Sequence, residues 1–245
     1  MIVAAQMWIF SQMAGLDGQI AGLLRGLAGA GYTSIEGLRD KAPHDLKTLQ
    51  TAGIAYGAIH LTTHKLEPLE PLLAFLNEVG ANHVCCSGPL EWNARTADDY
   101  RRTATFMNEK GSRLREHEIR LHYHNHEFEF DKVEGERTAM DMLLSELDPD
   151  AVTLCFDAGW AERAGQNAAE FMGEHSERIG VLHLRDFRGP QSVPLGLGDI
   201  DLAAQIALLS HLPNLHYVAV EQDPSFHPLA DMQTSRRYLR DKFGL

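Results

Sequence analysis

Two histidines and two acidic residues each stand near the end of a short apolar segment in the second half of the chain: His124, Asp157, His183 and Glu221. In all four segments large apolar side chains alternate with polar or small ones, as in β-strands whose two faces meet different surroundings. In neighbouring parallel strands the four side chains would share one face and meet at one end. Two imidazoles and two carboxylates form a donor set that favours Mn, Zn, Co or Fe over Ca or Mg. Any one of these residues taken alone would more often be a hydrogen-bonded core or rim residue, but the four together indicate a divalent-metal site.

These segments belong to an alternation of strand and helix patterns that runs along the whole sequence. The expected strands are Ile2–Ile9, Tyr32–Gly37, Ile54–Leu61, His83–Ser87, Ile119–Asn125, Val152–Asp157, Ile179–Leu184 and His216–Glu221. The expected helices are Gln19–Ala28, Pro43–Thr51, Glu67–Val79, Asp98–Glu116, Thr138–Leu147, Ala168–His175, Leu202–Leu209 and Met232–Lys242. Eight units in 245 residues is about 31 residues per unit, which is near the size expected of a barrel unit. We therefore expect one α/β domain over residues 1–245, a (β/α)8 TIM barrel. An open doubly wound sheet is the alternative, but no Gly-rich phosphate fingerprint follows the first strand.

Composition and charge narrow the function further. Lys and Arg number 22 against 34 for Asp and Glu, giving a formal charge of -12, which disfavours a nucleic-acid partner. The segment Met1–Gly15 has no Lys or Arg and contains Gln6 and Gln12, so we expect neither a signal peptide nor a membrane anchor. The adjacent Cys85 and Cys86 would point to opposite faces of a strand, which leaves Cys155 without an obvious disulfide partner. A cytoplasmic protein fits best.

Five motifs at the expected strand ends carry a resemblance to a known family. They are Tyr123-His124-Asn125-His126-Glu127-Phe128-Glu129-Phe130, Asp157-Ala158-Gly159-Trp160, His183-Leu184-Arg185-Asp186, Gly196-Leu197-Gly198-Asp199-Ile200-Asp201 and Val220-Glu221-Gln222-Asp223. As an ordered set they resemble the sugar phosphate isomerase/epimerase group of the xylose isomerase-like barrel superfamily. The resemblance implies one bound divalent cation held by His124, Asp157, His183 and Glu221. Manganese is the first expectation, with zinc, cobalt and iron as alternatives.

The resemblance implies a small sugar or keto-sugar substrate in carbohydrate metabolism and an isomerase or epimerase reaction. In that reaction a proton next to a carbonyl is removed and the metal stabilises an enediolate. Many related ketose epimerases have a glutamate where this chain has His124, so a dehydratase (lyase) acting on an inosose or a 3-keto sugar is the alternative. Two other classes stay open: an abasic-site endonuclease, which the charge disfavours, and a non-catalytic sugar-binding protein.

Three residues are candidates for moving the proton. Glu221 is the first candidate for the base, because one carboxylate oxygen can remain free of the metal. His126 has the same parity as His124 and lies one pleat further along; we expect it to contact substrate, or to be the ligand itself if the strand register is shifted. His60 ends the third strand, where it could act in acid–base chemistry near neutral pH or simply be packed.

Four further residues are candidates for binding substrate. Trp160 is expected to form a stacking wall for a sugar ring, unless it is a core aromatic. Arg185 is the candidate for contacting an anionic or polyhydroxy substrate, and the alternative is a salt bridge with Asp186 or Glu36. Glu36 and Gln6 are expected at the pocket floor. We find no basic cluster or Gly-rich nest for a phosphate, and a homo-oligomer is compatible with the sequence.

A loop over the mouth is expected from Phe187–Asp199, which carries Gly189, Pro190, Pro194, Gly196 and Gly198 and has no periodicity.

Overall fold

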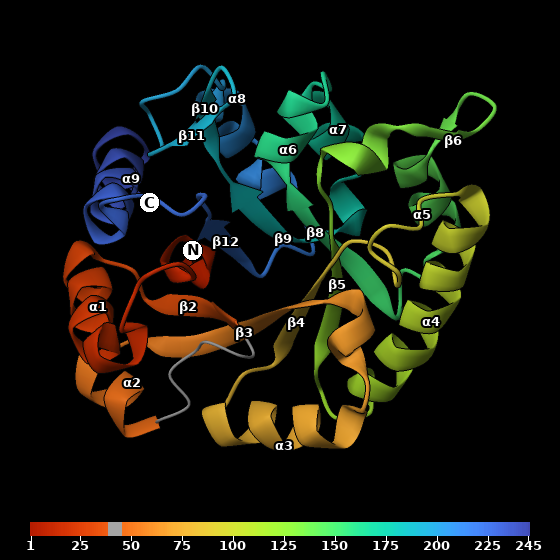
Figure 1. Ribbon diagram of the computed structural model, residues 1–245. Coiled ribbons are helices and arrows are strands. Elements are labelled where there is room, and N and C mark those ends of the chain that lie inside the picture. The colour runs from red at the N-terminus through yellow and green to blue at the C-terminus, as the bar shows by residue number, and fades with distance from the viewer. Residues whose placement is uncertain (39–45) are drawn as a thin grey trace.

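Eight parallel strands close into a barrel in the computed structural model, which describes residues 1–38 and 46–245 (Figure 1). Around the barrel the strand order is β1, β12, β9, β8, β5, β4, β3, β2, and β1 pairs with both β12 and β2. The strands are β1 (Val3–Gln6), β2 (Ser34–Leu38), β3 (Ala55–Thr62), β4 (His83–Ser87), β5 (Arg120–His124), β8 (Val152–Asp157), β9 (Ile179–Leu184) and β12 (Tyr217–Val220). The expected TIM barrel is confirmed, and the open sheet is wrong because the first strand is paired on both edges.

The helices surround the barrel and follow the strands in turn (Figure 1). They are α1 (Leu16–Ala30), α2 (Leu46–Ala52), α3 (Leu69–Val79), α4 (Ala97–Arg115), α5 (Ala139–Glu146), α6 (Ala158–Arg163), α7 (Ala168–Glu174), α8 (Leu202–Ala207) and α9 (Pro228–Phe243). The first residues of the expected helix Pro43–Thr51 lie outside the described residues. Within the described ranges, none of the helices combines the length and the apolar character needed to cross a bilayer.

Most element boundaries shift by a few residues from the expected ones, and two differences have clear local reasons. β1 ends at Gln6 instead of Ile9, because the Gln6 side chain accepts a hydrogen bond from the Trp8 backbone and caps a 3-10 turn over Met7–Phe10. Helix α6 was not expected. It begins directly after β8, because Asp157 Oδ1 accepts a hydrogen bond from the Trp160 backbone N–H at 2.9 Å.

Strand parity separates two apolar layers, as the sequence predicts. Val152, Leu154 and Phe156 of β8 pack in the large core between strands and helices, whereas Cys155 faces the barrel interior. Apart from Tyr217, the interior layer is made of small side chains: Ala4, Ala58, Cys85, Cys155, Val181 and Ala219. Cys86 lies in the outer core, opposite Cys85, and all three cysteines are buried free thiols.

Asp186 organises the segment after β9, where the sequence predicts only a loop. Strands β10 (Asp186–Arg188) and β11 (Gln191–Val193) form an antiparallel hairpin. The Asp186 carboxylate then accepts backbone hydrogen bonds from Gly196 at 2.9 Å, Gly198 at 2.8 Å and Ile200 at 3.2 Å. A Cβ on Gly198 would lie 2.1 Å from Asp186 Oδ1, so the second glycine of this motif is required for the close approach. A second hairpin, β6 (Lys132–Glu134) with β7 (Arg137–Thr138), precedes α5.

A polar cluster lies towards the other, N-terminal end of the strands. His83 Nδ1 is 3.0 Å from His122 Nε2, and His122 Nδ1 is 2.7 Å from Thr153 Oγ1. The ring of His216 lies 4.9 Å from that of His83. Gly180 leaves room for these groups, because a Cβ there would lie 2.3 Å from Thr153 Oγ1.

This cluster predicts a loss of stability in acid. Burial, reinforced by the charges of His216 and Arg120, lowers the pKa of His83 from 6.5 to about 4. The unfolded chain takes up this proton as the pH falls below about 6.5 while the folded protein does not, so stability is complete above that pH and falls as the pH approaches 4. The shift corresponds to roughly 3 kcal/mol. The free energy of unfolding, measured with urea, should fall between about pH 7.5 and 4.5 in both proteins. The fall should be smaller in His83→Gln than in wild type by about this amount.

The matched control is His211→Gln, because His211 is exposed and its imidazole is solvated in both states. Its stability should follow the wild-type pH profile. Parallel profiles for wild type and His83→Gln would contradict the assignment.

Candidate functional site

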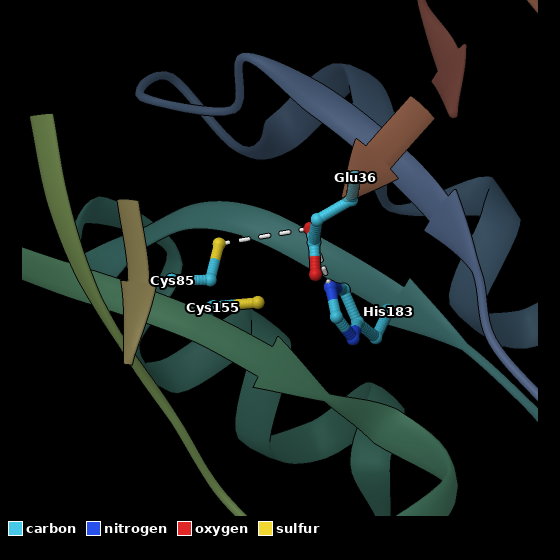
Figure 2. A group of neighbouring side chains, drawn as sticks. All are labelled: Glu36, Cys85, Cys155 and His183. Carbon is cyan, nitrogen blue, oxygen red and sulfur yellow. Dashed lines mark hydrogen bonds and ion pairs between the residues drawn. The ribbon is translucent and has the colours of Figure 1, made fainter. Parts of the chain in front are cut away.

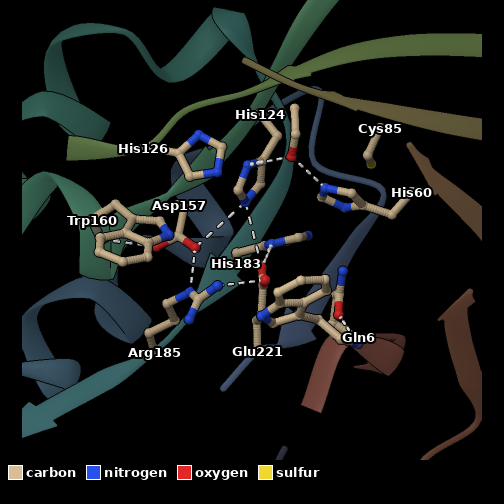
Figure 3. A network of polar contacts seen from close by, with 12 residues as sticks. Gln6, His60, Cys85, His124, His126, Asp157, Trp160, His183, Arg185 and Glu221 are labelled. Atoms are coloured by element: carbon tan, nitrogen blue, oxygen red, sulfur yellow. Dashed lines mark hydrogen bonds and ion pairs between the residues drawn. The ribbon is translucent and has the colours of Figure 1, made fainter. Parts of the chain in front are cut away.

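The structure brings the four predicted ligands together at the C-terminal end of the barrel (Figure 3). One ligand atom of each residue lies within 4.8 Å of those of the other three. His124 Nε2 is 3.5 Å from Asp157 Oδ2 and 3.4 Å from Glu221 Oε2, and His183 Nδ1 is 2.6 Å from the same Glu221 oxygen. All four side chains are at most 5% exposed. The expected register was therefore right at each of the four strands.

Strand pairing and one amide hold these residues in place. Asp157 lies opposite His183 in the β8–β9 register, and the Glu221 backbone N–H donates to the carbonyl of Leu184 at 3.0 Å. Asn125, the residue after His124, accepts from the Asp157 backbone N–H at 2.9 Å and donates to its carbonyl at 3.1 Å. The ends of neighbouring strands are thus fixed to each other, so the two ligands that they carry keep a constant separation.

Arg185 connects three carboxylates. Its Nε donates to Asp157 Oδ2 at 2.7 Å, one terminal nitrogen donates to Asp223 Oδ1 at 2.9 Å, and the other pairs with Glu221. Burial alone would lower the pKa of Arg185, but these carboxylates raise it, so the guanidinium stays charged. The alternative interpretation of Arg185, a salt bridge with Asp186 or Glu36, is wrong in its partners, which are Asp157, Glu221 and Asp223. Arg185 also lines the cavity, where the sequence predicts it to bind substrate.

The donor set fits a divalent cation. His124 Nε2 is buried without a hydrogen-bond partner although two carboxylate oxygens surround it. Burial would lower the pKa of His124 and of His183, but neighbouring carboxylates outweigh it and raise both values. Burial would also raise the pKa of Glu221, whereas Arg185 and the two imidazoles hold it well below its usual range. The site thus concentrates negative charge that protons on the imidazoles balance, and a metal ion would replace those protons.

Glu36 and His60 lie beneath these ligands. Glu36 is fully buried; its Oε1 is 2.6 Å from His60 Nδ1, and its Oε2 accepts from His183 Nε2 at 3.0 Å and from the Tyr217 hydroxyl at 2.6 Å. Burial alone would raise the pKa of Glu36, but the two imidazoles hold it well below its usual range. His60 Nε2 is 2.5 Å from Ser87 Oγ, and burial lowers the pKa of His60. Both nitrogens of His60 therefore have protein partners.

A second group of metal-ligand atoms includes the same carboxylate (Figure 2). Glu36, Cys85, Cys155 and His183 place one atom each within 4.8 Å of one another. Cys85 Sγ donates to Glu36 Oε2 at 3.6 Å, and burial raises the pKa of both thiols, which keeps them protonated. Glu36 accepts hydrogen bonds from both His183 Nε2 and the Cys85 thiol. These hydrogen bonds are sufficient to explain why the four ligand atoms lie close together without a metal ion.

A cavity of about 530 Å³ opens above the four predicted ligands. Its walls include all three tryptophans of the chain, Trp8, Trp92 and Trp160, together with Gln6 and His126. The Trp8 and Trp92 side chains are 42% and 37% exposed, so large aromatic faces are open to a bound molecule. Such faces pack well against the C–H surface of a polyol ring. The segment Phe187–Asp199, expected to cover the mouth, supplies none of the cavity-lining residues among those described.

Among the described residues of the cavity wall, two ring nitrogens outside the four predicted ligands lack a hydrogen-bond partner. His126 Nδ1 and Trp160 Nε1 are buried and make no hydrogen bond. The His126 ring stacks on Phe128, with centroids 5.0 Å apart, and its edge meets Trp92 at 5.1 Å. Burial lowers the pKa of His126 well below 6.5, so the ring is neutral. The site can therefore offer one neutral imidazole and one indole N–H to a ligand.

Some functional residues escaped the sequence analysis. Ser87 has the inward parity of Cys85 and ends β4, so parity could have identified it. Asn125 and Asp223 lie inside motifs that we quoted, but only the strand packing reveals their partners. Trp92 lies in the loop after β4, and nothing in its sequence neighbourhood indicates that the loop folds towards the mouth.

Comparisons with known proteins agree with the barrel fold. A model of the family described as xylose isomerase-like TIM barrel matches residues 24–242. An inosose dehydratase of Clostridium perfringens is 26% identical, over 89% of this chain and 88% of the relative. Among solved structures, a sugar phosphate isomerase/epimerase from Parabacteroides distasonis superposes with a TM-score of 0.79 at 20% identity, over 98% of this chain and 94% of that one. The IOLI protein with a bound zinc atom gives 0.77 at 16% identity, over 98% and 97%.

We predict one divalent ion per chain. Zinc or manganese titration should saturate at one ion, and His124→Ala should weaken binding by more than about 100-fold, because a ligand is lost from a buried site. His64→Gln, at an exposed histidine in the 3-10 turn after β3, is the control and should bind as wild type. Absence of an ion at about millimolar metal, or an ion held by other residues in a metal-soaked crystal, would refute the assignment.

Proposed function

The chain belongs to the xylose isomerase-like TIM barrel family, and from this premise we propose that it is a metal-dependent lyase that removes water from a cyclic keto-polyol of the inosose type. One observation carries the choice of elimination: His126 Nδ1 is an unpartnered imidazole nitrogen of the cavity wall that lies outside the four predicted ligands, beside two carboxylates, Asp157 and Glu221, whose oxygens are already engaged. The curated relatives named inosose dehydratase support the same reaction.

From the sequence alone, isomerisation or epimerisation is the first expectation and dehydration the alternative. Epimerisation at one carbon needs groups that deliver and remove a proton on opposite faces, as the two-glutamate epimerase mechanism does. Here His124 stands where such enzymes have a glutamate, and Glu221 is bonded to His183 and Arg185. Elimination needs only one group, which takes a proton and returns it to the departing hydroxyl.

His124, Asp157, His183 and Glu221 would hold the ion. When bound, a divalent metal polarises a ketone and stabilises negative charge on its oxygen. Arg185 keeps Asp157 and Glu221 oriented towards the site, since it donates to both. The two imidazoles and two carboxylates suit zinc, manganese, cobalt or iron.

The proton is moved by the protein. His126 Nδ1 takes the proton from the carbon next to the ketone, and the electron pair of that C–H bond becomes a C=C bond conjugated to the ketone as the hydroxyl on the next carbon departs. The His126 imidazolium returns the same proton to this hydroxyl, so one water leaves and the ring is neutral again. If the carbon that lost the proton carries a hydroxyl, the product enol tautomerises to a 1,2-diketone. No oxidant or reductant is needed.

The cavity walls position the ring. Trp8, Trp92 and Trp160 present aromatic surface to the substrate, and Trp160 Nε1 donates to one of its hydroxyls. The formal charge of -12 disfavours abasic DNA, and a non-catalytic sugar-binding protein would need neither an unpartnered imidazole nor a metal cluster.

The proposed function can be tested by incubating the protein with candidate substrates. Metal-loaded protein incubated with inososes, 3-keto glycosides and ketoses in D2O should convert at least one cyclic keto-polyol to a product lighter by one water, measured by mass spectrometry. Solvent deuterium incorporated into an otherwise unchanged or isomerised sugar, without water loss, would instead establish the isomerase class. If a metal-loaded protein consumes and labels nothing, the enzyme hypothesis fails.

A second test identifies the proton-transfer group. His126→Gln should retain the metal while the rate of water loss falls by roughly 10²-fold or more, because Gln cannot act as a base. Glu221→Gln should lose metal affinity and dehydration together, since Glu221 contacts both the imidazole ligands and Arg185. A fully metal-loaded Glu221→Gln protein that does not dehydrate the substrate, together with an active His126→Gln protein, would return the base to Glu221.

A further inference from the structure

We propose that Glu36 is a positioning residue that sets which ring nitrogen carries the proton in both imidazole ligands, directly for His183 and through His60 and Ser87 for His124. The inference rests on the metal role proposed above for these two histidines. An imidazole can bind a metal only through a nitrogen without a proton, so the tautomer of each ring decides whether the site works.

The direct branch is a single hydrogen bond. Glu36 Oε2 lies 3.0 Å from His183 Nε2 (Figure 2). The other ring nitrogen, His183 Nδ1, lies 2.6 Å from Glu221 Oε2 in the ligand cluster. The carboxylate is surrounded by groups that donate: the Tyr217 hydroxyl at 2.6 Å, the Cys85 thiol at 3.6 Å and the two imidazoles. Carboxylates only accept, so both His183 nitrogens carry a proton while no ion is bound. A metal ion at Nδ1 would replace the proton there, and Glu36 keeps the remaining proton of the neutral ring on Nε2.

The indirect branch runs through His60 and Ser87 to the other ligand, His124. Figure 3 shows the rings of His60 and His124. Glu36 Oε1 is 2.6 Å from His60 Nδ1, which must therefore donate. In a neutral ring the other nitrogen then accepts, and His60 Nε2 takes the Ser87 hydroxyl proton at 2.5 Å. With its own proton committed, Ser87 Oγ can only accept from His124 Nδ1 at 3.2 Å.

The indirect branch ends at His124 Nε2, which has no hydrogen-bond partner. If His124 carries its proton on Nδ1, the lone pair lies on Nε2. That nitrogen makes no hydrogen bond and lies 3.4 Å from Glu221 and 3.5 Å from Asp157. One buried carboxylate thus accounts for the proton positions of three imidazoles, and every donor in the path has an acceptor.

The first test is Glu36→Gln. An amide has one acceptor oxygen and one donor group, so it can accept from only one of the two imidazoles, and the other ring must move its proton to the nitrogen that faces the site. Zinc affinity should fall by about 10- to 100-fold. In zinc-loaded wild type, long-range 1H–15N spectra should place the ring protons on His183 Nε2, His60 Nδ1 and His124 Nδ1, and at least one of these positions should change in the variant.

Two further variants separate positioning from folding. Ser87→Ala cuts only the indirect branch, so the His124 proton should move, that of His183 should stay on Nε2, and zinc affinity should fall. Tyr217→Phe removes a donor to Glu36 but leaves both imidazole bonds, so it should bind zinc as wild type does. If Glu36→Gln does not fold, Ser87→Ala still decides the indirect branch.

The outcomes also distinguish this inference from the proposed reaction, because metal affinity and ring protons are measured without substrate. Wild-type affinity and unchanged ring protons in folded Glu36→Gln or Ser87→Ala would overturn the inference while leaving dehydration untouched. A second Co2+ ion with a thiolate charge-transfer band that is lost in Cys155→Ser would also overturn it, since Glu36 would then be a ligand.

Discussion

The burial of three carboxylates inside the barrel is the constraint on which the rest of the site depends. Glu36 and Asp157 are fully buried and Glu221 is 5% exposed. An unpaired charge in such surroundings is costly, so each carboxylate needs compensating donors. Arg185 serves Asp157 and Glu221 from one side, and the imidazoles serve all three from the other. Removing one partner exposes the remaining charges to one another, which is why this network must be considered as a unit.

The barrel separates this costly interior from the part that stabilises the fold. The outer layer between strands and helices holds the large aliphatic and aromatic residues, whereas the inner layer has Ala4, Ala58 and Ala219 at positions where a bulkier side chain would fill the centre. Small interior residues leave space for polar side chains to meet in the middle. The free energy gained by burying apolar side chains in the outer layer offsets the cost of burying charged side chains inside the barrel.

This separation also explains how far the sequence could be interpreted. Large apolar residues of one parity identified the outer layer, so the inward parity of His124 and Asp157 followed, and with it the convergence at the strand ends. The partners of Asp186 could not be predicted, because a carboxylate that accepts three backbone N–H groups depends on the path of the following loop. Trp92 escaped for the same reason. Strand periodicity carries no information about loop direction.

His124 links the hydrogen-bond path from Glu36 to the proposed dehydration. A glutamate ligand, as the family resemblance implies for related epimerases, presents equivalent oxygens and needs no particular tautomer. A histidine ligand presents one of two different nitrogens, so it requires a partner that holds the proton on the other, and Ser87 occupies that place at 3.2 Å. Exchanging a carboxylate for a neutral imidazole also removes one negative charge from the ligand set. Two carboxylates then balance a divalent ion instead of exceeding its charge, so the ion keeps more of its power to polarise a ketone oxygen. The same exchange removes a carboxylate that could move protons, which would leave the neutral His126 ring in the cavity wall as the proton-transfer group proposed above. A ligand set of this kind therefore favours a reaction that needs strong carbonyl polarisation and one proton shuttle over a reaction that needs two opposed bases.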